Sequence, residues 1–449
     1  MKLKQTKKYL ALAISVALLS ACGDTTVEIN ELAPIVIENP DHDHDEINGA
    51  GRLVVSAIDN NFVQVLELPE KTELATFMVN ATPSAIFSSG DYRYAAIVQR
   101  NQDLVNFIDG GLWQENHVDH LHDYQEAPRF MPFQLTGVRP THFQQAPGQL
   151  AVFFDGNSAT GAAASVAVLT DADIGEDRSD YPQLTLTTHQ HGAAQARGEF
   201  LISTLRDANS STTLPNQVAL YKKHSDHFDE VQVFAETCPN LHGSAQSHDF
   251  VAFGCADGVL LIAQDGETFT ATKLANTADF TGTQRVGTLV GSPEAEHFVG
   301  LAGADVFAIH AEDNEMEKLD WQPGAATAVW GSDFAYQDKR FVLLDNTGQL
   351  TIFEYHGHEH ANTNTAAFSF LAKVQVTEAD LTALPAGSRF QLAVSAADDK
   401  VYVTDPIAKQ LITIDVHEAE ITARKQLNFT PHKLAWVGIA EPTEEHHDH

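Results

Sequence analysis

The sequence contains little sulfur, with three cysteines and four methionines in 449 residues. Cys22 lies near the N-terminus, and only Cys238 and Cys255 follow it. If these cysteines are committed to a lipid and to a disulfide, no thiolate or thioether site is left to favour Cu(I). The sequence also lacks a Gly-x-Ser-x-Gly motif, a phosphate-binding loop and a Rossmann fingerprint, so no familiar motif points to an enzyme.

Basic residues are also scarce, because 27 lysines and arginines stand against 61 aspartates and glutamates. Removal of residues 1–21 takes away four of the 27 and no acid, which leaves 23 basic residues and a formal charge of −38. This charge argues against a nucleic-acid partner. It concentrates cations around the protein and is compatible with a metal carrier.

The N-terminus has the pattern of a secretion signal. Four lysines precede an apolar run from Tyr9 to Leu19, which is too short for a stable membrane span. The run ends in a lipobox at residues 19–22, so residues 1–21 resemble a bacterial lipoprotein signal. Cys22 would then be the lipidated first residue of the mature chain. An ordinary secretory signal with an incidental cysteine is the alternative. Residues 22–50 are acidic and have the composition of a tether, so we expect a lipid-anchored envelope protein that faces the periplasm or the cell surface.

Histidine and acidic residues are concentrated in a few short segments. The densest lies between Trp113 and Glu126. Imidazole and carboxylate are ligands that Zn²⁺ accepts with little geometric demand, so we predict zinc binding. A solvated polar loop is the alternative, and an expression tag is the alternative for the C-terminal segment, although tags are not usually interleaved with acids. The predicted ligands are His117, His120, His122 and Asp123 in the densest segment, and the secondary or transfer ligands are His42, His44, His356, His358, His360, His446, His447 and His449.

Most of the chain consists of short strand patterns separated by Gly, Asp, Asn and Pro. Residues 82–109 and 390–415 both read as strand, acidic turn, strand, turn and a strand ending in Ile-Asp, and both resemble the YVTN class of propeller repeat. A period near fifty residues with four strands per unit is typical of a propeller blade. We predict an all-β chain with a single propeller of eight blades, or seven as the alternative, at 51–440 and a His/Asp-rich tail at 441–449. The strand pattern at 431–437 is expected to complete the N-terminal blade and close the ring.

Three consecutive units carry a histidine near the start of the inner strand. His142, His191 and His242 precede the next strand pattern by eight, nine and eight residues. Inner strands line the central channel of a propeller, so equivalent positions in adjacent blades should bring these imidazoles together. Buried structural histidine is the alternative for each one alone. We predict a polar or metal site at the channel mouth, with His189 as a further ligand and His432 at the related position of the closing strand.

The two later cysteines flank a predicted hairpin whose turn lies at about 247–249. Pairing across this turn places Cys238 and Cys255 nearly opposite each other, within the reach of a disulfide. An oxidising envelope favours their pairing. We expect a disulfide inside one blade.

Strand order predicts where the His-rich segments lie. In a four-stranded blade the turns between the first and second strands and between the third and fourth strands share one face. Both termini and the segments with His117 and His356 attach to strands at that face. We therefore expect four His-rich segments at one end of the channel and the inner-strand histidines at the other.

Several segments resemble the periplasmic zinc metallochaperones of propeller fold, which accompany certain zinc ABC transporters and hand Zn²⁺ to the solute-binding protein. The resemblance covers nearly all of the folded region and is carried by residues 110–124, 139–142, 191–192, 238–243 and 253–258. It implies a zinc carrier rather than an enzyme, partnered by the periplasmic zinc-binding receptor, with the segment around His42 and His44 taking part in transfer. We expect a monomer. A lactonase-like propeller hydrolase and a surface-anchored metal-buffering module are the alternatives, and the lipid anchor and His/Asp tail depart from the plainest version of the family.

Overall fold

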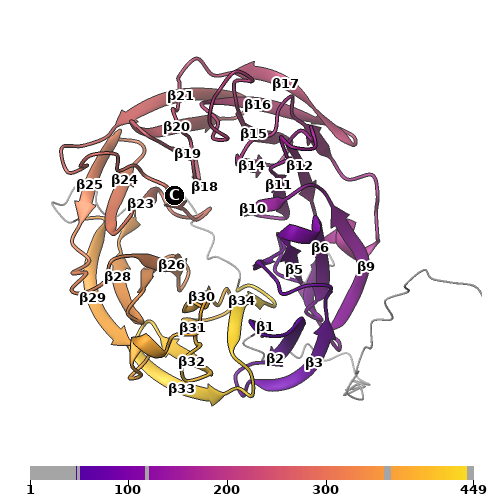
Figure 1. Ribbon diagram of the computed structural model, residues 1–449, viewed down its shortest axis with the longest axis vertical. Coiled ribbons are helices and arrows are strands. Elements are labelled where there is room, and N and C mark those ends of the chain that lie inside the picture. The colour runs from indigo at the N-terminus through magenta and orange to yellow at the C-terminus, as the bar shows by residue number, and fades with distance from the viewer. Residues whose placement is uncertain (1–46, 48–50, 117–120, 358–365, 442–449) are drawn as a thin grey trace, which may run out of the picture.

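The computed structural model describes residues 47, 51–116, 121–357 and 366–441, and these are almost entirely β-strands and turns. Six four-stranded sheets and one eight-stranded sheet, which contains two blades, stand around a central axis (Figure 1). In seven blades the strand that comes first in the chain lies innermost, and in the remaining blade the innermost strand is the last described strand of the chain, β34 (Pro431–Val437) (Figure 1). The predicted all-β propeller of eight blades is therefore confirmed.

Each blade contains four antiparallel strands, which are named in order from the innermost outwards. Blade 1 contains β34 (Pro431–Val437), β1 (Arg52–Ala57), β2 (Phe62–Glu67) and β3 (Thr72–Met78), and blade 2 contains β4 (Ala85–Ser88), β5 (Tyr94–Gln99), β6 (Leu104–Asp109) and β9 (Arg129–Thr136). Blade 3 contains β10 (Pro140–Ala146), β11 (Gln149–Phe154), β12 (Ser165–Leu169) and β13 (Gln183–Thr185), and blade 4 contains β14 (Ala194–Arg197), β15 (Phe200–Leu205), β16 (Gln217–His224) and β17 (His227–Val233). Blade 5 contains β18 (Ser244–Gln246), β19 (Phe250–Cys255), β20 (Gly258–Asp265) and β21 (Thr268–Ala275), and blade 6 contains β22 (Thr288–Val290), β23 (His297–Ala302), β24 (Asp305–His310) and β25 (Glu315–Leu319). Blade 7 contains β26 (Val329–Ala335), β27 (Arg340–Asp345), β28 (Gln349–Tyr355) and β29 (Phe368–Gln375), and blade 8 contains β30 (Gln391–Val394), β31 (Lys400–Asp405), β32 (Gln410–Asp415) and β33 (Glu420–Gln426).

A few elements lie outside the blades. The predicted loop between β6 and β9 contains a hairpin, in which Trp113 stacks on Tyr124 with ring centroids 4.9 Å apart. No helix in the described part of the chain is long and apolar enough to span a membrane. The additional elements are β7 (Leu112–Asn116), β8 (Leu121–Gln125), α1 (Asp171–Gly175) and the 3-10 turns η1 (Arg100–Gln102) and η3 (Leu381–Ala383).

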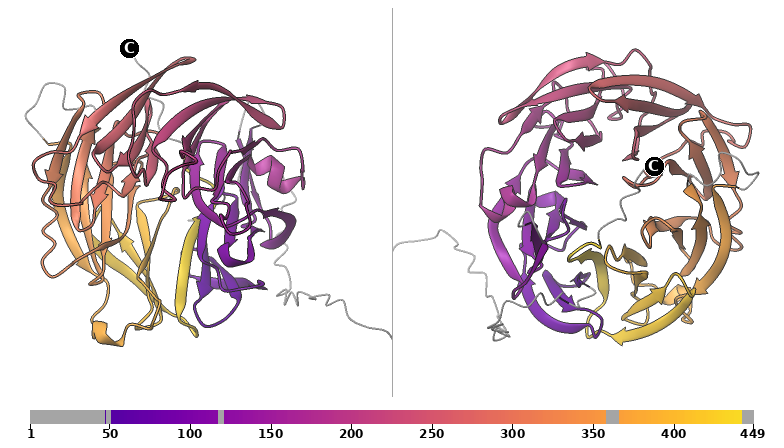
Figure 2. Two further views of the ribbon diagram at one scale, coloured as in Figure 1. Left: turned by 45° about the horizontal axis from the view of Figure 1, so that its top comes forward. Right: turned by 180° about the vertical axis from the view of Figure 1, so that it is seen from behind.

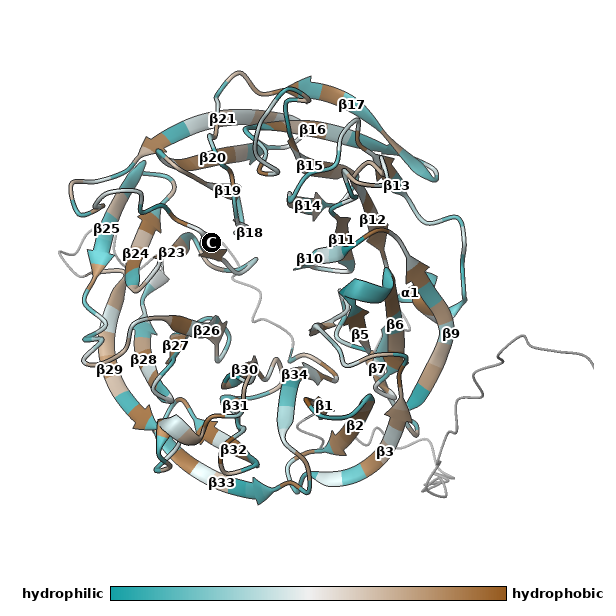
Figure 3. Cartoon of the chain, in the orientation of Figure 1, coloured by the Kyte–Doolittle hydropathy of each residue, from teal (hydrophilic) through white to brown (hydrophobic). Residues whose placement is uncertain are grey.

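Burial explains why these segments form blades. Every residue of β5 and of β27 is buried, whereas β33 at the perimeter is exposed along nearly its whole length. Figure 3 shows hydrophobic residues along the middle strands and hydrophilic stretches on outer strands such as β25 and β33. The hydrophobic clusters lie between neighbouring blades, so that Phe107 of blade 2 and Val152 of blade 3 belong to one cluster. Each large apolar side chain buried in this way stabilises the fold by about 1.5–3 kcal/mol.

The ring closes by pairing its two ends, as predicted. β34 lies beside β1, with Trp436 opposite Leu53, and Figure 2 shows this yellow C-terminal strand next to the indigo N-terminal strands. Trp436 is only 2% exposed. A Cβ on Gly51 would lie 2.4 Å from its indole ring, so only glycine fits there. Closure thus depends on one large side chain packed against the first residues of the propeller.

The strand order gives the ring two distinct ends. We call the end at which the innermost strands begin the start end, and the end at which they turn into the second strands the turn end. Arg52 donates a hydrogen bond of 2.7 Å to the Glu126 carbonyl at the base of the β7–β8 hairpin, and Glu441 N–H donates one of 2.8 Å to the carbonyl of Ala396 in a first-to-second turn. The described residues that adjoin residues 1–46, 117–120, 358–365 and 442–449 therefore lie at the turn end, as predicted. Those four segments, with Cys22 and nine of the predicted histidines, lie outside the described residues.

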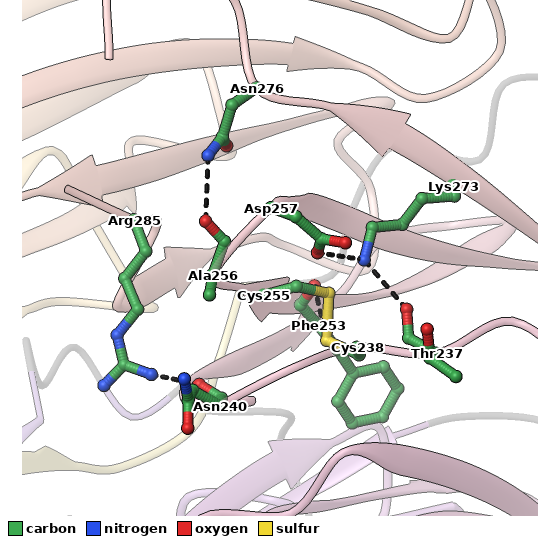
Figure 4. Close-up of a disulfide and its surroundings, with 10 residues drawn as sticks. All are labelled: Thr237, Cys238, Asn240, Phe253, Cys255, Ala256, Asp257, Lys273, Asn276 and Arg285. Carbon is green, nitrogen blue, oxygen red and sulfur yellow. Dashed lines mark hydrogen bonds and ion pairs between the residues drawn. A yellow bond between two sulfur atoms is a disulfide. The ribbon is translucent and has the colours of Figure 1, made fainter. Parts of the chain in front are cut away.

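The predicted disulfide is present. Cys238 and Cys255 are joined with their Cα atoms 4.8 Å apart, and both are fully buried (Figure 4). Lys273 crosses this region, donating to the Thr237 carbonyl at 2.9 Å and pairing with Asp257 at 2.5 Å. The disulfide therefore fixes the segment from Cys238 to the innermost strand of blade 5.

Replacing both cysteines with alanine is expected to lower the free energy of unfolding by about 3 kcal/mol, because the disulfide closes a short loop in the unfolded chain. Chemical denaturation of the oxidised protein and of the Cys238→Ala/Cys255→Ala variant measures the difference. Mass spectrometry of the unreduced protein provides the control, and two free thiols would contradict the pairing.

Candidate metal centre

Three histidines converge at the start end of the ring. His142 lies in β10, and His191 and His242 shortly precede β14 and β18, the innermost strands of the next two blades. The Nε2 atom of His191 lies 3.4 Å from that of His142 and 3.2 Å from that of His242. The ligand atoms of all three residues lie within 4.8 Å of one another, and within the described residues no other group of three or more possible ligands is so close.

Two of the three nitrogen separations match the dimensions of a tetrahedral zinc site. Zinc binds imidazole nitrogen at about 2.0–2.1 Å, so two nitrogens on one tetrahedral ion lie roughly 3.3 Å apart. The observed separations of 3.2 and 3.4 Å bracket that value. Three histidines leave the fourth position of the ion open to a water molecule or to a ligand from another protein.

Hydrogen bonds decide which ring nitrogens carry protons. Nδ1 of His242 lies 2.6 Å from the carbonyl oxygen of Gly287, which can only accept, so His242 donates from Nδ1. Nδ1 of His191 lies 3.0 Å from the Asp155 carboxylate and donates to it. In the neutral rings both Nε2 atoms therefore carry lone pairs, and these meet at 3.2 Å with no proton between them. A proton shared between the two rings, or a metal ion bound by both, makes this contact favourable.

Asp155 connects the cluster to a wider network. It comes directly after β11 and accepts a hydrogen bond of 2.8 Å from Arg100, which also donates to Thr141 at 3.0 Å. Its second carboxylate oxygen, Oδ1, is buried and accepts no hydrogen bond from the described residues. A carboxylate behind a metal-binding histidine orients the ring and raises the basicity of the ligating nitrogen. Asp155 is placed to do this for His191.

Two glycines allow the histidines to approach neighbouring blades. A Cβ on Gly192 would lie 2.3 Å from the Thr204 hydroxyl. Gly243 has a φ of +80°, and a Cβ there would lie 2.8 Å from the carbonyl oxygen of Gly287, to which His242 donates. Gly192 follows His191 and Gly243 follows His242, and both glycines are therefore needed for packing around the cluster.

Burial favours the uncharged form of two of the imidazoles, His142 and His242. It lowers the pKa of His142 to about 4, and the proximity of His191 and His242 adds to the shift. Burial also lowers the pKa of His242 below its usual value. Burial alone would raise the pKa of Asp155, but hydrogen bonds from His191 and Arg100 outweigh it and lower that pKa. At neutral pH the buried imidazoles face an ionised carboxylate, a protonation state that suits zinc binding.

Replacing Asp155 with asparagine is expected to weaken zinc binding about 10–100-fold, because the amide removes the charge behind His191 while keeping its size. Competition with a chromophoric chelator measures the dissociation constant. Asp249→Asn is a matched control, since Asp249 pairs with the exposed His248 at the turn end, 3.0 Å away. Equal dissociation constants for Asp155→Asn and the unmodified protein would exclude a role for Asp155.

Two other predicted residues at the start end lie apart from the three histidines. His189 lines a separate cavity of about 220 Å³ that also includes Thr188 and Arg206. His432 is not part of the close group. Burial lowers the pKa of His432 to about 4, and its Nδ1 atom is buried with no hydrogen-bond partner among the described residues.

The predicted ligands in the His-rich segments lie at the opposite end where they are described. His122 is exposed on β8, with its ring 4.5 Å from that of Tyr124, and Asp123 accepts a hydrogen bond of 2.8 Å from Gln114. His356 follows β28 and lies 2.8 Å from the Ser369 hydroxyl. The residues outside the described part of the chain are His42, His44, His117, His120, His358, His360, His446, His447 and His449.

Three residues of the site were not predicted from the sequence. They are Asp155, Arg100 and Gly287, which contact the cluster from loops of blades 3, 2 and 6. Only Asp155 had a usable signal, because an acid directly after the strand next to a predicted channel histidine is suitably placed to support it.

Comparison with known proteins finds a relative that covers most of the chain. No model of a protein family matches the chain. The zinc chaperone AztD of Citrobacter koseri is 25% identical over 415 residues, which cover 90% of this chain and 91% of AztD. The crystal structure of Citrobacter koseri AztD superposes with a TM-score of 0.71 at 22% identity, covering 88% of this chain and all of that one, and the apo structure gives 0.70 at 21% identity, covering 87% and 98%. The predicted resemblance is confirmed at this level, since the chain is similar to AztD in sequence over nine tenths of its length and shares its fold.

Proposed function

We propose that this protein is a zinc-binding metallochaperone of the bacterial cell envelope whose tight site consists of His142, His191 and His242. The observation that carries the proposal is the convergence of three imidazoles, with Nε2 separations of 3.2 and 3.4 Å that suit ligands of one zinc ion. The ligand set favours zinc, and so does the similarity to a protein named as a zinc chaperone.

The geometry suits a carrier that must both hold and release its cargo. Buried histidines that are already neutral bind zinc without first losing a proton. The hydrogen bonds to Asp155 and Gly287 orient two of the rings before the ion arrives. The His191 side chain is 29% exposed, so a ligand from a partner can reach the open position. Such a ligand can join before a histidine leaves, and zinc then passes on without release of the free ion.

The proposed receiver is the solute-binding protein of a zinc ABC transporter, and the proposed anchor is a lipid on Cys22. Residues 41–46 and 444–449 are His- and Asp-rich and would supply weaker sites that exchange zinc quickly. The described residues next to the His-rich segments lie at the turn end, away from the three histidines. We therefore assign tight binding to the ring and weaker, rapidly exchanging binding to these segments.

A transfer assay tests the function. Zinc-loaded protein is mixed with the metal-free periplasmic zinc receptor of the same cell in the presence of excess chelator. Transfer that is faster than release of zinc to the chelator supports the chaperone, and transfer limited by that release contradicts it. Deleting residues 41–46 and 444–449 should lower the zinc stoichiometry or slow transfer, and should leave tight binding intact. Zinc-dependent hydrolysis of a lactone panel would favour a propeller hydrolase instead.

Zinc held by the three histidines is expected to resist acid better than zinc held by exposed histidines. An exposed imidazole titrates near pH 6.5, whereas burial lowers the pKa values of His142 and His242, that of His142 to about 4. Because protons compete only below the pKa, we expect the exposed sites to empty first as the pH falls. Acid is also expected to destabilise the metal-free fold, because the unfolded chain takes up a proton on His142 more readily than the folded one. The contribution of His142 to the free energy of unfolding is fully present above pH 6.5 and is lost as the pH falls toward about 4. Equilibrium dialysis across this range measures zinc release, and a single release step would contradict the expectation.

A further inference from the structure

A second pair of histidines faces a carboxylate on the hairpin between β16 and β17. His224 ends β16 and His227 begins β17, and the two are paired across a two-residue turn with ring centroids 6.0 Å apart. Asp229 lies two residues further along β17, on the same side of the strand as His227. Its carboxylate oxygens lie 3.7 Å from Nε2 of His224 and 3.9 Å from Nε2 of His227. All three side chains are more than half exposed, so ions in solution reach them.

The turn that carries this pair is fixed to the neighbouring blade. The N–H of Gln183 in β13 donates to the carbonyl of Asp226 at 3.0 Å, and Gln183 and His227 pair where β13 and β17 run in parallel. This pairing joins blades 3 and 4 into one eight-stranded sheet. Nδ1 of His227 lies 3.1 Å from the Asp226 carboxylate and donates to it, which leaves a lone pair on Nε2. Asp226 therefore orients His227 as Asp155 orients His191.

We propose that His224, His227 and Asp229 form a second zinc site, weaker and more open than the three buried histidines. Two imidazoles and one carboxylate are a ligand set that zinc accepts. Zinc bound to two imidazole nitrogens at about 2.0–2.1 Å holds the ring centroids roughly 5 Å apart, so the observed 6.0 Å needs only a small rotation of exposed side chains. Ordering these side chains costs conformational entropy, which makes the affinity lower than at the buried site.

The surroundings of the hairpin support a cation site at this end. Other histidines at the turn end also lie beside acids. In the β16–β17 hairpin two imidazoles lie within 3.9 Å of one carboxylate. The other histidine–acid pairs are His248 with Asp249 at 3.0 Å, His310 with Glu317 at 3.6 Å, His356 with Glu354 at 3.9 Å and His417 with Glu418 at 3.6 Å. The ring of His310 also packs against that of His297, with centroids 4.6 Å apart.

Residue-specific protection tests this site in the full mature chain. Zinc is added stepwise, and modification of each histidine by diethyl pyrocarbonate is mapped by mass spectrometry. We expect His224 and His227 to become protected together, at zinc concentrations above those that protect His191. Asp229→Asn should raise the concentration needed by about tenfold or more. The His224→Ala/His227→Ala variant should bind one zinc ion fewer.

His417→Ala is the matched control, because it removes an exposed histidine with an acidic neighbour at the same end and should leave the stoichiometry unchanged. If His224 and His227 stay as reactive as His417 at every zinc concentration, the hairpin site does not exist. Protection of His191 is read in the same experiment. Failure of the hairpin site is therefore distinguishable from failure of the proposed tight site.

Discussion

Replacing His191 with alanine is expected to weaken tight zinc binding by at least about a hundredfold, more than loss of a supporting residue costs. His191 is the central member of the cluster, since its Nε2 atom lies within 3.4 Å of the corresponding atoms of both His142 and His242. Its removal leaves two protein ligands and takes from Asp155 the ring that it orients. Chelator competition at pH 7 measures the dissociation constant.

His432→Ala is the matched control for this experiment. It removes a partly buried imidazole of lowered pKa at the same end of the ring, but one outside the close group. We expect its zinc affinity to equal that of the unmodified protein. Equal losses in the two variants would mean that zinc affinity reflects the integrity of the start end and not ligation by His191.

Replacing Trp436 with alanine is expected to lower the free energy of unfolding by about 3–5 kcal/mol, the range for a large aromatic side chain removed from a core. Trp436 is 2% exposed and packs edge-on against Tyr92, with ring centroids 5.4 Å apart. Its carbonyl accepts a hydrogen bond of 2.5 Å from Ser88, so it also links blade 1 to blade 2. The substitution therefore weakens the packing of β34, the strand that closes the ring.

Trp113→Ala controls for the removal of an indole. Trp113 stacks on Tyr124 in the β7–β8 hairpin outside the blades, so we expect a loss below about 1 kcal/mol. Denaturant titration of both variants gives the comparison. A Trp436→Ala variant as stable as Trp113→Ala would show that closure does not depend on the indole.

The fold was predictable because its signals are local and repeated. Short strand patterns recur with a period near fifty residues, and eight second strands can be counted along the chain. The closing strand was predictable because Pro431–Val437 was left without a unit of its own, and the structure pairs it with β1. The hairpin that carries His122 was not predicted, since its mostly polar strands lack the usual apolar alternation.

The site was predictable only in part. His142, His191 and His242 were predicted because equivalent positions in successive repeats lie next to each other around the central channel. Composition, by contrast, favoured the segment around His122, which lies at the other end of the ring. Arg100 lies 55 residues before Asp155, and no local pattern announces a contact of that kind.

Diffraction at the zinc absorption edge, from crystals of the full-length protein grown with one equivalent of zinc, tests the tight site most directly. We predict one anomalous peak at the start end, about 2.0–2.1 Å from the Nε2 atoms of His142, His191 and His242. A dominant peak at any other place, with those three nitrogens not coordinating, would contradict the assignment of the tight site.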